Sequence, residues 1–374
     1  MSRLVLSPLD AVTPQGLVRN VSIVLENGII TDISPLATPE SGPRPLAIPS
    51  FIDLHIHGAG GYGPEQNTPE SLLRMSAILA RQGVFAFCPT LYCARPAALA
   101  QQLRCLLPAL GHESGAHIIG FHLEGPFISP EKPGVMKPQD IAPANLDDFK
   151  QIYDAAQGHI SIVTLAPEVP GIDPIIEFCL QHHILVQAGH TNATYEQMQA
   201  ACQKGVQGVT HWGNAMSGLQ QRAPGALGAA LLNADLSCEV IADGRHIHPA
   251  LLSLLRCVKP ISQITAITDA LLPTGQPQGP FYANQEEVLL QDGVWKRKQD
   301  AVTAGSNLTM DRAFRQLLQA DYSLEQAVLC TSTNAARKMS IPCPAISPSN
   351  PGNFVVLNAT FEREATLLNG KYIS

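Results

Sequence analysis

The chain has 374 residues, of which 45% are hydrophobic and 15% charged, a balance typical of a globular protein with one large and one small domain. Its net charge of −7 argues against nucleic acid as a partner, because phosphate backbones recruit basic surfaces. No stretch reaches the ~18 apolar residues of a membrane span, and no signal peptide is expected at the start. Nine cysteines without paired spacing are expected to be reduced thiols, so we expect a cytoplasmic protein with no membrane partner.

The two ends of the chain are both patterned as short strands. The runs 21–25 and 29–33 flank Asn27-Gly28, a pair that suits the positive φ angles of a type I′ hairpin turn. The apolar run 354–357 is followed by a second Asn-Gly pair near the C-terminus. Neither end has enough apolar residues for a stable sheet of its own. We therefore expect residues 1–50 and 345–374 to form one small β-sandwich domain together.

Between these ends, short β-like runs alternate with helical stretches. A helix is predicted to begin at Pro69, which Thr68 can cap, and to end before Gly83. Eight strands alternating with helices over ~220 residues are what a (β/α)8 TIM-type barrel requires. A doubly wound sheet is the alternative, but we expect an α/β barrel over residues 51–344. The predicted barrel strands are 51–57, 84–90, 117–124, 160–165, 184–190, 206–211, 237–242 and 264–269.

Polar residues gather at the ends of these predicted strands, and in a barrel the carboxyl ends of the strands form the active-site face. His55 and His57 lie two residues apart in a strand, so both side chains point to one side and can bind one metal ion. Each histidine taken singly could merely satisfy a buried hydrogen bond. Side chains that can bind a metal or transfer a proton occur at five strand ends, which favours a metal site. Imidazole with carboxylate suits Zn²⁺ or Fe²⁺. The remaining strand ends carry Glu124, His190, His211 and Asp269.

Nine motifs are spread along the chain: PSFIDLHIHGAGGYG (49–63), GFHLEGPFISPEKPG (120–134), VTLAPE (163–168), AGHTNATYEQ (188–197), THWGNAMSGLQQRAPGALGAAL (210–231), IADGRHIHP (241–249), ITDALLPTG (267–275), AGSNLTMDRA (304–313) and TSTNAAR (331–337). In this order they resemble the N-acetylglucosamine-6-phosphate deacetylase family of amidohydrolases. The resemblance implies a barrel with a β-sandwich formed by both termini, and a homodimer.

The resemblance also implies roles for the residues at the strand ends. It implies one or two divalent ions per subunit, with Zn²⁺ expected and Fe²⁺ or another metal as the alternative. The implied roles are Glu124, His190 and His211 as ligands of the main ion, His55 and His57 as ligands of a second ion, and Asp269 as the catalytic residue.

Further residues match positions that contact the substrate in the resembling family. His246 matches a histidine that contacts the sugar, and Asn214 and Ala215 match the place where backbone amides meet the phosphate. Arg222 matches an arginine that reaches the phosphate bound by the neighbouring subunit. The resemblance thus implies a phosphorylated amino sugar as the small-molecule partner.

The loop after the third predicted strand departs from the family pattern. Val135 and Met136 lie at substrate-contacting positions, and Met136 replaces a histidine. Because methionine cannot donate a strong hydrogen bond, one polar contact to the ligand is either missing or supplied elsewhere. Gly213 and Ala223 also stand where the family usually has an aromatic and an acidic residue. These differences leave the identity of the sugar open.

The expected activity is metal-dependent hydrolysis of the N-acetyl group of an amino-sugar 6-phosphate, giving acetate, with N-acetylglucosamine-6-phosphate as the expected substrate. Its galacto epimer or another N-acyl amino sugar is the near alternative. A cyclic-amide hydrolase is a second alternative, but such enzymes often use a carboxylated lysine where Glu124 stands. A silent sugar-phosphate sensor is a third, but it would be expected to lack Glu124 or Asp269, and both are present.

Overall fold

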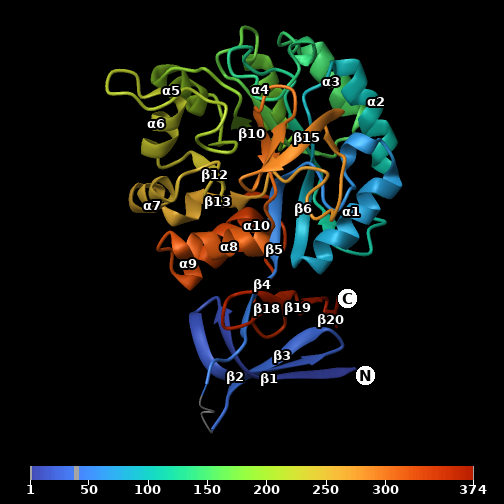
Figure 1. The fold of residues 1–374 in the computed structure, drawn as a ribbon, viewed down its shortest axis with the longest axis vertical. Coiled ribbons are helices and arrows are strands. Elements are labelled where there is room, and N and C mark those ends of the chain that lie inside the picture. The colour runs from blue at the N-terminus through green and yellow to red at the C-terminus, as the bar shows by residue number, and fades with distance from the viewer. Residues whose placement is uncertain (1, 38–41, 374) are drawn as a thin grey trace.

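The computed structural model describes residues 2–37 and 42–373, and its larger part is a barrel of parallel strands (Figure 1). The strands follow the order β13-β12-β11-β10-β9-β8-β6-β5, and the ring closes where the Asp269 amide donates to the His55 carbonyl at 2.9 Å. The expected barrel is confirmed. Its strands are β5 (Phe51–Ile56), β6 (Val84–Leu91), β8 (Phe121–Glu124), β9 (Ile160–Leu165), β10 (Leu185–Ala188), β11 (Gly208–Val209), β12 (Ser237–Ile241) and β13 (Ile264–Ile267).

Several strands differ in length from the predicted runs. The third run is divided into β7 (His117–Ile118) and β8, and β13 ends at Ile267, before the predicted end at Asp269. Strands β10 and β11 also end before His190 and His211. The polar residues at these ends therefore lie on the first loop residues, where the backbone is released from the ladder and can turn toward the mouth of the barrel.

Helices surround the barrel, and α1 shows how an apolar face is buried. In α1, Leu72, Met75 and Leu79 are buried, and the Thr68 hydroxyl caps the helix by accepting from the Ser71 amide at 3.2 Å. Within the described residues, none of the helices combines the length and the apolar character needed to cross a membrane. The helices are α1 (Pro69–Arg81), α2 (Pro96–Leu106), α3 (Leu146–Ala155), α4 (Asp173–Gln181), α5 (Tyr195–Gln203), α6 (Gly225–Leu232), α7 (Pro249–Val258), α8 (Met310–Gln319), α9 (Leu324–Val328) and α10 (Asn334–Lys338).

Both ends of the chain meet in a separate β domain, as expected. Its seven strands are hydrogen-bonded in the order β20-β19-β18-β4-β1-β2-β3 and fold over a core that includes Ile23 and Phe354 (Figure 1). Both Asn-Gly pairs form turns with positive φ, 51° and 85° at Asn27-Gly28. The strands are β1 (Arg3–Thr13), β2 (Gly16–Glu26), β3 (Ile29–Pro35), β4 (Leu46–Pro49), β18 (Phe354–Leu357), β19 (Arg363–Leu368) and β20 (Lys371–Tyr372).

A third sheet, which the sequence analysis did not predict, follows β13. It consists of β14 (Phe281–Ala283), β15 (Glu286–Gln291), β16 (Val294–Arg297) and β17 (Thr303–Ser306). Its buried Val288 and Trp295 form a small apolar cluster with Tyr92, Met136 and Leu271. The sheet thus packs on loops at the mouth of the barrel and forms part of the wall around the site.

Candidate active site

The carboxyl ends of the strands bring six potential metal ligands together, and the structure places all of them in buried positions. Glu124 is the last residue of β8, whereas His57 and Asp269 follow β5 and β13 directly or nearly so. These ligands divide into two groups, in each of which the ligand atoms lie within 4.8 Å of one another. The first group is His55, His57 and Asp269, and the second group is Glu124, His190 and His211.

The backbone is sharply turned at three of these residues. His190, His211 and Asp269 have φ angles of 48°, 32° and 50°. Residues other than glycine rarely adopt this left-handed region, which costs ~1–3 kcal/mol and is concentrated at functional sites. Before His190, Gly189 permits the close approach, because a Cβ there would lie 2.6 Å from the Thr164 side chain.

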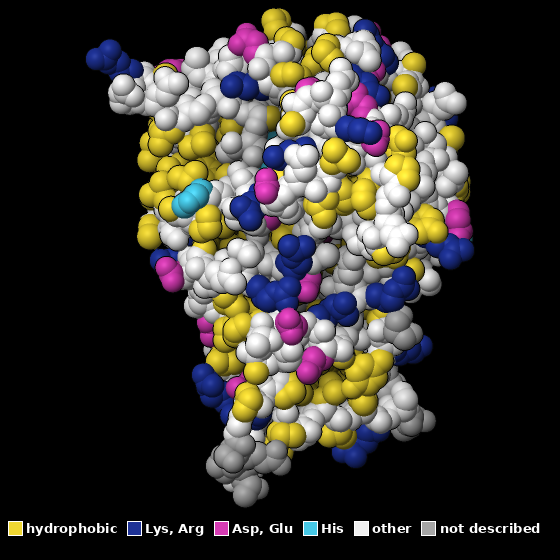
Figure 2. All heavy atoms as spheres, in the orientation of Figure 1, with side chains coloured by type: hydrophobic (Ala, Val, Ile, Leu, Met, Phe, Trp, Pro, Cys, Tyr) yellow, Lys and Arg dark blue, Asp and Glu magenta, His cyan; other side chains and the backbone are white. Residues whose placement is uncertain are grey.

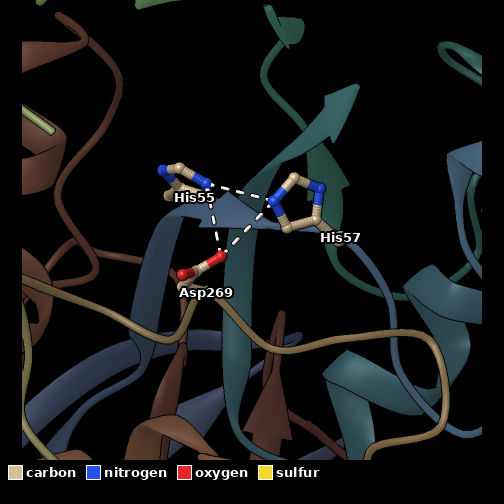
Figure 3. A group of neighbouring side chains, drawn as sticks. All are labelled: His55, His57 and Asp269. Carbon is tan, nitrogen blue, oxygen red and sulfur yellow. Dashed lines mark hydrogen bonds and ion pairs between the residues drawn. The ribbon is translucent and has the colours of Figure 1, made fainter. Parts of the chain in front are cut away.

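The first group forms a compact triangle (Figure 3). The Nε2 atoms of His55 and His57 are 3.3 Å apart, and Asp269 Oδ1 lies 3.5 Å and 3.3 Å from them. Two imidazole nitrogens and a carboxylate oxygen at such spacing can share one divalent cation.

The second group is centred on the Glu124 carboxylate. Its Oε1 lies 3.1 Å from His190 Nε2 and 3.0 Å from His211 Nε2. Glu124 also reaches the first group, since Oε2 lies 3.3 Å from His57 Nε2 and Oε1 lies 3.5 Å from His55 Nε2. Glu124 therefore contacts both groups.

The far ring nitrogens of three of these histidines are fixed by backbone carbonyls. His190 Nδ1 donates to the Lys132 carbonyl at 3.0 Å, and His211 Nδ1 donates to the Asn214 carbonyl at 3.2 Å. His57 Nδ1 donates to the Thr90 carbonyl at 3.0 Å. Such bonds set the tautomer that leaves Nε2 free as a ligand. His55 Nδ1 is buried and has no partner among the described residues.

The charges in this cluster are strongly coupled. Burial raises the pKa of Glu124, but the nearby His55 and hydrogen bonds from His190 and His211 outweigh burial and hold it well below its usual range. Burial lowers the pKa of His57, but hydrogen bonds to Asp269 and Glu124 outweigh burial and raise it to about 9. Burial lowers the pKa of His55 well below its usual value. Four imidazoles around two buried carboxylates fit a divalent-cation centre, because a bound cation would offset the carboxylate charge and take the place of the protons on the ring nitrogens.

A cavity of about 220 Å³ opens above the two groups. The structure brings all but one of the remaining predicted site residues to its wall. Val135 and Met136 lie in the loop after β8, and Asn214 and Ala215 follow His211. Arg222 does not line the cavity, and it is exposed on the loop before α6. The described lining contains neither lysine nor arginine.

His246 enters the cavity wall with its ring held by an aspartate. Its Nδ1 donates to Asp243 Oδ2 at 2.7 Å, and Asp243 Oδ1 accepts from the backbone amides of Arg245 and His246. Burial raises the pKa of Asp243, but its bonds to His246 outweigh burial and lower it. These bonds hold the His246 ring in one orientation at the cavity wall.

Two parts of the wall were not predicted from the sequence. Val302 and the first three residues of β17, Thr303 to Gly305, line the cavity. Tyr92 also lines it, and its ring stacks parallel on His57 with centroids 3.8 Å apart. A usable signal existed for Tyr92, because it follows β6 directly, at the kind of position that carried the other site residues.

Comparisons with known proteins identify the family of the chain. Residues 46–372 match the amidohydrolase family. N-acetylgalactosamine-6-phosphate deacetylase of Escherichia coli O157:H7 is 29% identical over 367 residues, covering 97% of both chains. N-acetylglucosamine-6-phosphate deacetylase of Vibrio furnissii is 32% identical over 338 residues, covering 89% of this chain and 84% of its own.

A solved structure agrees as well. A mutant of the N-acetyl-D-glucosamine-6-phosphate deacetylase of Mycobacterium smegmatis, in complex with N-acetyl-D-glucosamine-6-phosphate, superposes with a TM-score of 0.91 and 26% identity, covering 100% of both chains. The family match spans most of the chain, and the metal-ligand groups lie at the mouth of the same type of barrel. The chain therefore belongs to the amidohydrolase family and is a hydrolase with a divalent-metal centre.

Proposed function

We propose that the protein hydrolyses the N-acetyl group of an amino-sugar 6-phosphate, with N-acetylglucosamine-6-phosphate as the first substrate to test. The observation that carries this proposal is the position of Asp269 at the cavity, 3.3 Å from the His57 nitrogen and beside a carboxylate ringed by histidines. The relatives named above act on acetylated amino-sugar phosphates, which supports this substrate class.

The chemistry requires a stronger nucleophile and a more reactive carbonyl than water and an amide offer. A divalent cation, when bound, polarises the carbonyl and makes water more acidic. As the water oxygen bonds to the acyl carbon, Asp269 accepts a proton from that water. Asp269 then returns that proton to the sugar nitrogen as the carbon–nitrogen bond breaks. The products are acetate and the free amino-sugar phosphate.

We assign the metal as Zn²⁺, with Fe²⁺ as the alternative, and we assign two ions per subunit. The support is the donor set, because nitrogen and oxygen ligands of this mixture suit both metals. Glu124, His190 and His211 would hold the main ion, and His55 and His57 the other. His246 would orient the sugar or the carbonyl through its free Nε2.

The phosphate requires a cationic partner that the described cavity wall does not contain. The Ala215 amide, which makes no hydrogen bond within the described residues, can supply one neutral donor. We propose that Arg222 supplies the charge from a second copy of the chain. The support is that the loop before α6, to which Arg222 belongs, stands out from the body of the molecule (Figure 1).

An apolar surface next to this loop supports a homodimer. Hydrophobic side chains gather on the side of the molecule where α6 and α7 lie (Figure 2). Leu219 and Leu232 are 52% and 61% exposed there, which is costly unless another surface covers them. The exposed large side chains of this side are Leu219, Leu232, Leu251, Leu254 and Val258.

The assay that tests the function measures acetate release by the Zn²⁺-loaded protein. The panel pairs N-acetylglucosamine and N-acetylgalactosamine, each with and without a 6-phosphate. We expect the highest kcat/KM with a 6-phosphate. Preference for the galacto epimer would favour N-acetylgalactosamine-6-phosphate as the substrate, a candidate supported by a relative that matches 97% of the chain. Absence of acetate from all four sugars would contradict the proposal.

Arg222→Ala tests the shared site. A charge-assisted contact contributes ~1.5–3 kcal/mol, so we expect KM for phosphorylated sugars to rise roughly tenfold or more while unphosphorylated sugars are unaffected. Arg245→Ala, another exposed arginine on a mouth loop, is the matched control. Equal effects on both kinds of sugar would mean that Arg222 does not meet the phosphate.

Two further assignments complete the proposal. We place the protein in the cytoplasm, because all nine cysteines are free, as expected in a reducing compartment. We also take residues 1–50 with 345–374 as the β domain and 51–344 as the hydrolase barrel.

A further inference from the structure

A buried carboxylate that the proposed reaction does not use lies on the strand that carries His55. Asp53 belongs to β5, and because side chains alternate along a strand, it lies on the same side of β5 as His55. It is 0% exposed and belongs to neither ligand group. Its role therefore has to be sought in the hydrogen bonds that it accepts.

These hydrogen bonds cross the gap between β5 and β13. The order of hydrogen-bonded strands begins at one of these strands and ends at the other, so no ladder joins them within the described residues. Asp53 Oδ1 accepts from the Thr268 amide at 3.2 Å and from the His55 amide at 3.3 Å. Its Oδ2 accepts from the Thr268 hydroxyl at 2.6 Å. One carboxylate thus bonds to the strand of His55 and to the residue before Asp269.

Thr268 extends this contact to the turn at Asp269. Its hydroxyl, which donates to Asp53, also accepts from the Ala270 amide at 3.2 Å, and its carbonyl accepts from the Ser306 hydroxyl. Asp269 lies between these bonds with a φ of 50°, a strained conformation that persists only where the surrounding structure holds it. The bonds fix the backbone at Asp269 but do not involve its carboxylate, which stays available to exchange a proton.

Closure of the barrel does not by itself require a carboxylate at this position. A backbone bond already crosses the gap, from the Asp269 amide to the His55 carbonyl at 2.9 Å. A buried carboxylate is costly to remove from water unless its acceptors are used. A strand ladder could not hold the Asp269 turn, because the chain leaves the extended conformation there. A side chain that accepts from both segments can hold it.

We propose that Asp53 and Thr268 are positioning residues that hold the turn at Asp269 against His55. They would set the distance between the carboxylate that transfers the proton and the first ligand group, where Asp269 Oδ1 lies 3.5 Å from His55 Nε2 (Figure 3). This inference rests on the proposed role of Asp269 in deacetylation. Misplacement of a catalytic group by about 1 Å can lower a rate by ~10²-fold, so the pair affects turnover without touching the substrate.

Thr268→Val tests the pair, since it keeps the shape of the side chain and removes the hydroxyl. We expect kcat for acetate release to fall by ~10- to 100-fold with KM unchanged. Thr268→Ser, which keeps the hydroxyl, should retain most of kcat. Thr331→Val is the matched control, because the buried Thr331 hydroxyl donates to the Ala327 carbonyl, away from the ligand groups. Both valine variants should lower Tm, but only Thr268→Val should lower kcat.

Asp53→Asn completes a double-mutant cycle. Asparagine keeps the size of the side chain but has one acceptor oxygen in place of two. If the two residues act as a unit, Asp53→Asn/Thr268→Val should lower kcat no further than the more severe single variant. Additive losses would mean that Asp53 and Thr268 do not act on Asp269 together.

A second readout needs no substrate. Residues that orient metal ligands typically contribute ~10–100-fold to metal affinity, so Thr268→Val should weaken one Zn²⁺ ion by about that factor and leave the other unchanged. Competition with a chelator measures both ions.

Four results would overturn the assignment. They are a wild-type kcat in Thr268→Val, a kcat in Thr268→Ser as low as in Thr268→Val, an equal loss of kcat in Thr331→Val, and binding of both ions that is either unchanged or equally weakened. Absence of acetate release by the wild type would instead contradict the proposed function. The Zn²⁺ competition would still test the pair in that case, so the two failures are distinguishable.

Discussion

The two ligand groups are built from the same kinds of side chain but are held differently. In the second group, His190 and His211 are both fixed through Nδ1 by loop carbonyls, and both have left-handed backbones. In the first group, His57 is fixed by the Thr90 carbonyl and the Tyr92 ring, whereas His55 Nδ1 has no partner among the described residues. The surrounding structure therefore orients the second group more completely.

This difference suggests a division of roles between the groups. A site whose ligands are preoriented loses less conformational freedom when it binds an ion, so the second group should bind more tightly. The first group contains Asp269, which has to exchange a proton in each catalytic cycle if it acts as proposed. A carboxylate that transfers a proton therefore suits a group whose ligands are less rigidly oriented.

Asp269→Asn should have the largest effect on kcat. A small effect would contradict the proposed division of roles between the two ligand groups. Asparagine keeps the size and can still weakly contact a cation, but it cannot accept the proton. We expect kcat to fall by at least ~10²-fold while the bound metal and the affinity for substrate persist. Elemental analysis alongside steady-state kinetics measures both. A kcat within a few-fold of wild type would rule out the proton-transfer role, and loss of metal would make Asp269 a ligand first.

Stepwise metal removal sharpens the comparison. Protein saturated with Zn²⁺ should hold more than one equivalent, and His55→Ala/His57→Ala should hold about one. A metal-binding histidine that lacks a hydrogen bond to its other ring nitrogen typically binds the metal ~10–100-fold more weakly. His55 lacks such a bond, so a chelator should remove the ion of the first group first. His190→Ala is the matched variant, and we expect it to lose the tighter ion. Simultaneous release of both ions would contradict the difference between the groups.

The smallest expected effect is on the stability of the metal-free protein. In that state the pKa of His57 is about 9, above its ordinary value of 6.5, so the protonated ring stabilises the fold. This stabilisation is complete below about pH 6.5 and is lost as the pH rises through about 9, by at most about 3 kcal/mol. Tm of the metal-free protein should therefore fall across this window.

Metal loading provides the control for that measurement. A bound cation requires the neutral imidazole, so Tm of the loaded protein should not fall between pH 6.5 and 9. His57→Asn should reduce the fall in the metal-free protein. An identical pH profile for metal-free wild type and variant would mean that the protonated His57 does not contribute.

Much of the fold could be predicted because local patterns determine it. Short β-like runs between helical stretches marked all eight barrel strands, because a strand of a parallel barrel is buried on both faces, as β13 is, and appears as a short apolar run. Thr68 and Pro69 marked the start of α1 through interactions within one helical turn. The Asn-Gly pairs marked hairpin turns because they tolerate positive φ.

The ligand groups could be anticipated for a related reason. In a parallel barrel all carboxyl ends meet at one mouth, so residues such as His55 and Asp269, far apart in sequence, are brought together by topology alone. Sequence position therefore predicted that Glu124 would lie near both His55 and Asp269. It could not predict the left-handed turns at His190 and His211, because residues other than glycine rarely adopt this conformation.

The remainder was decided by tertiary structure. The sheet β14–β17 has few buried residues of its own and is placed by contacts to distant loops. The stacking of Tyr92 on His57 and the isolation of its hydroxyl depend on what surrounds them, which no local pattern records. The sequence by itself determined the barrel and the chemical character of the residues at its strand ends, because the runs that form strands are local and the topology of a parallel barrel is general. Only the packed structure decided how firmly each ligand is held and which side chains line the cavity, because those properties arise from contacts between distant segments.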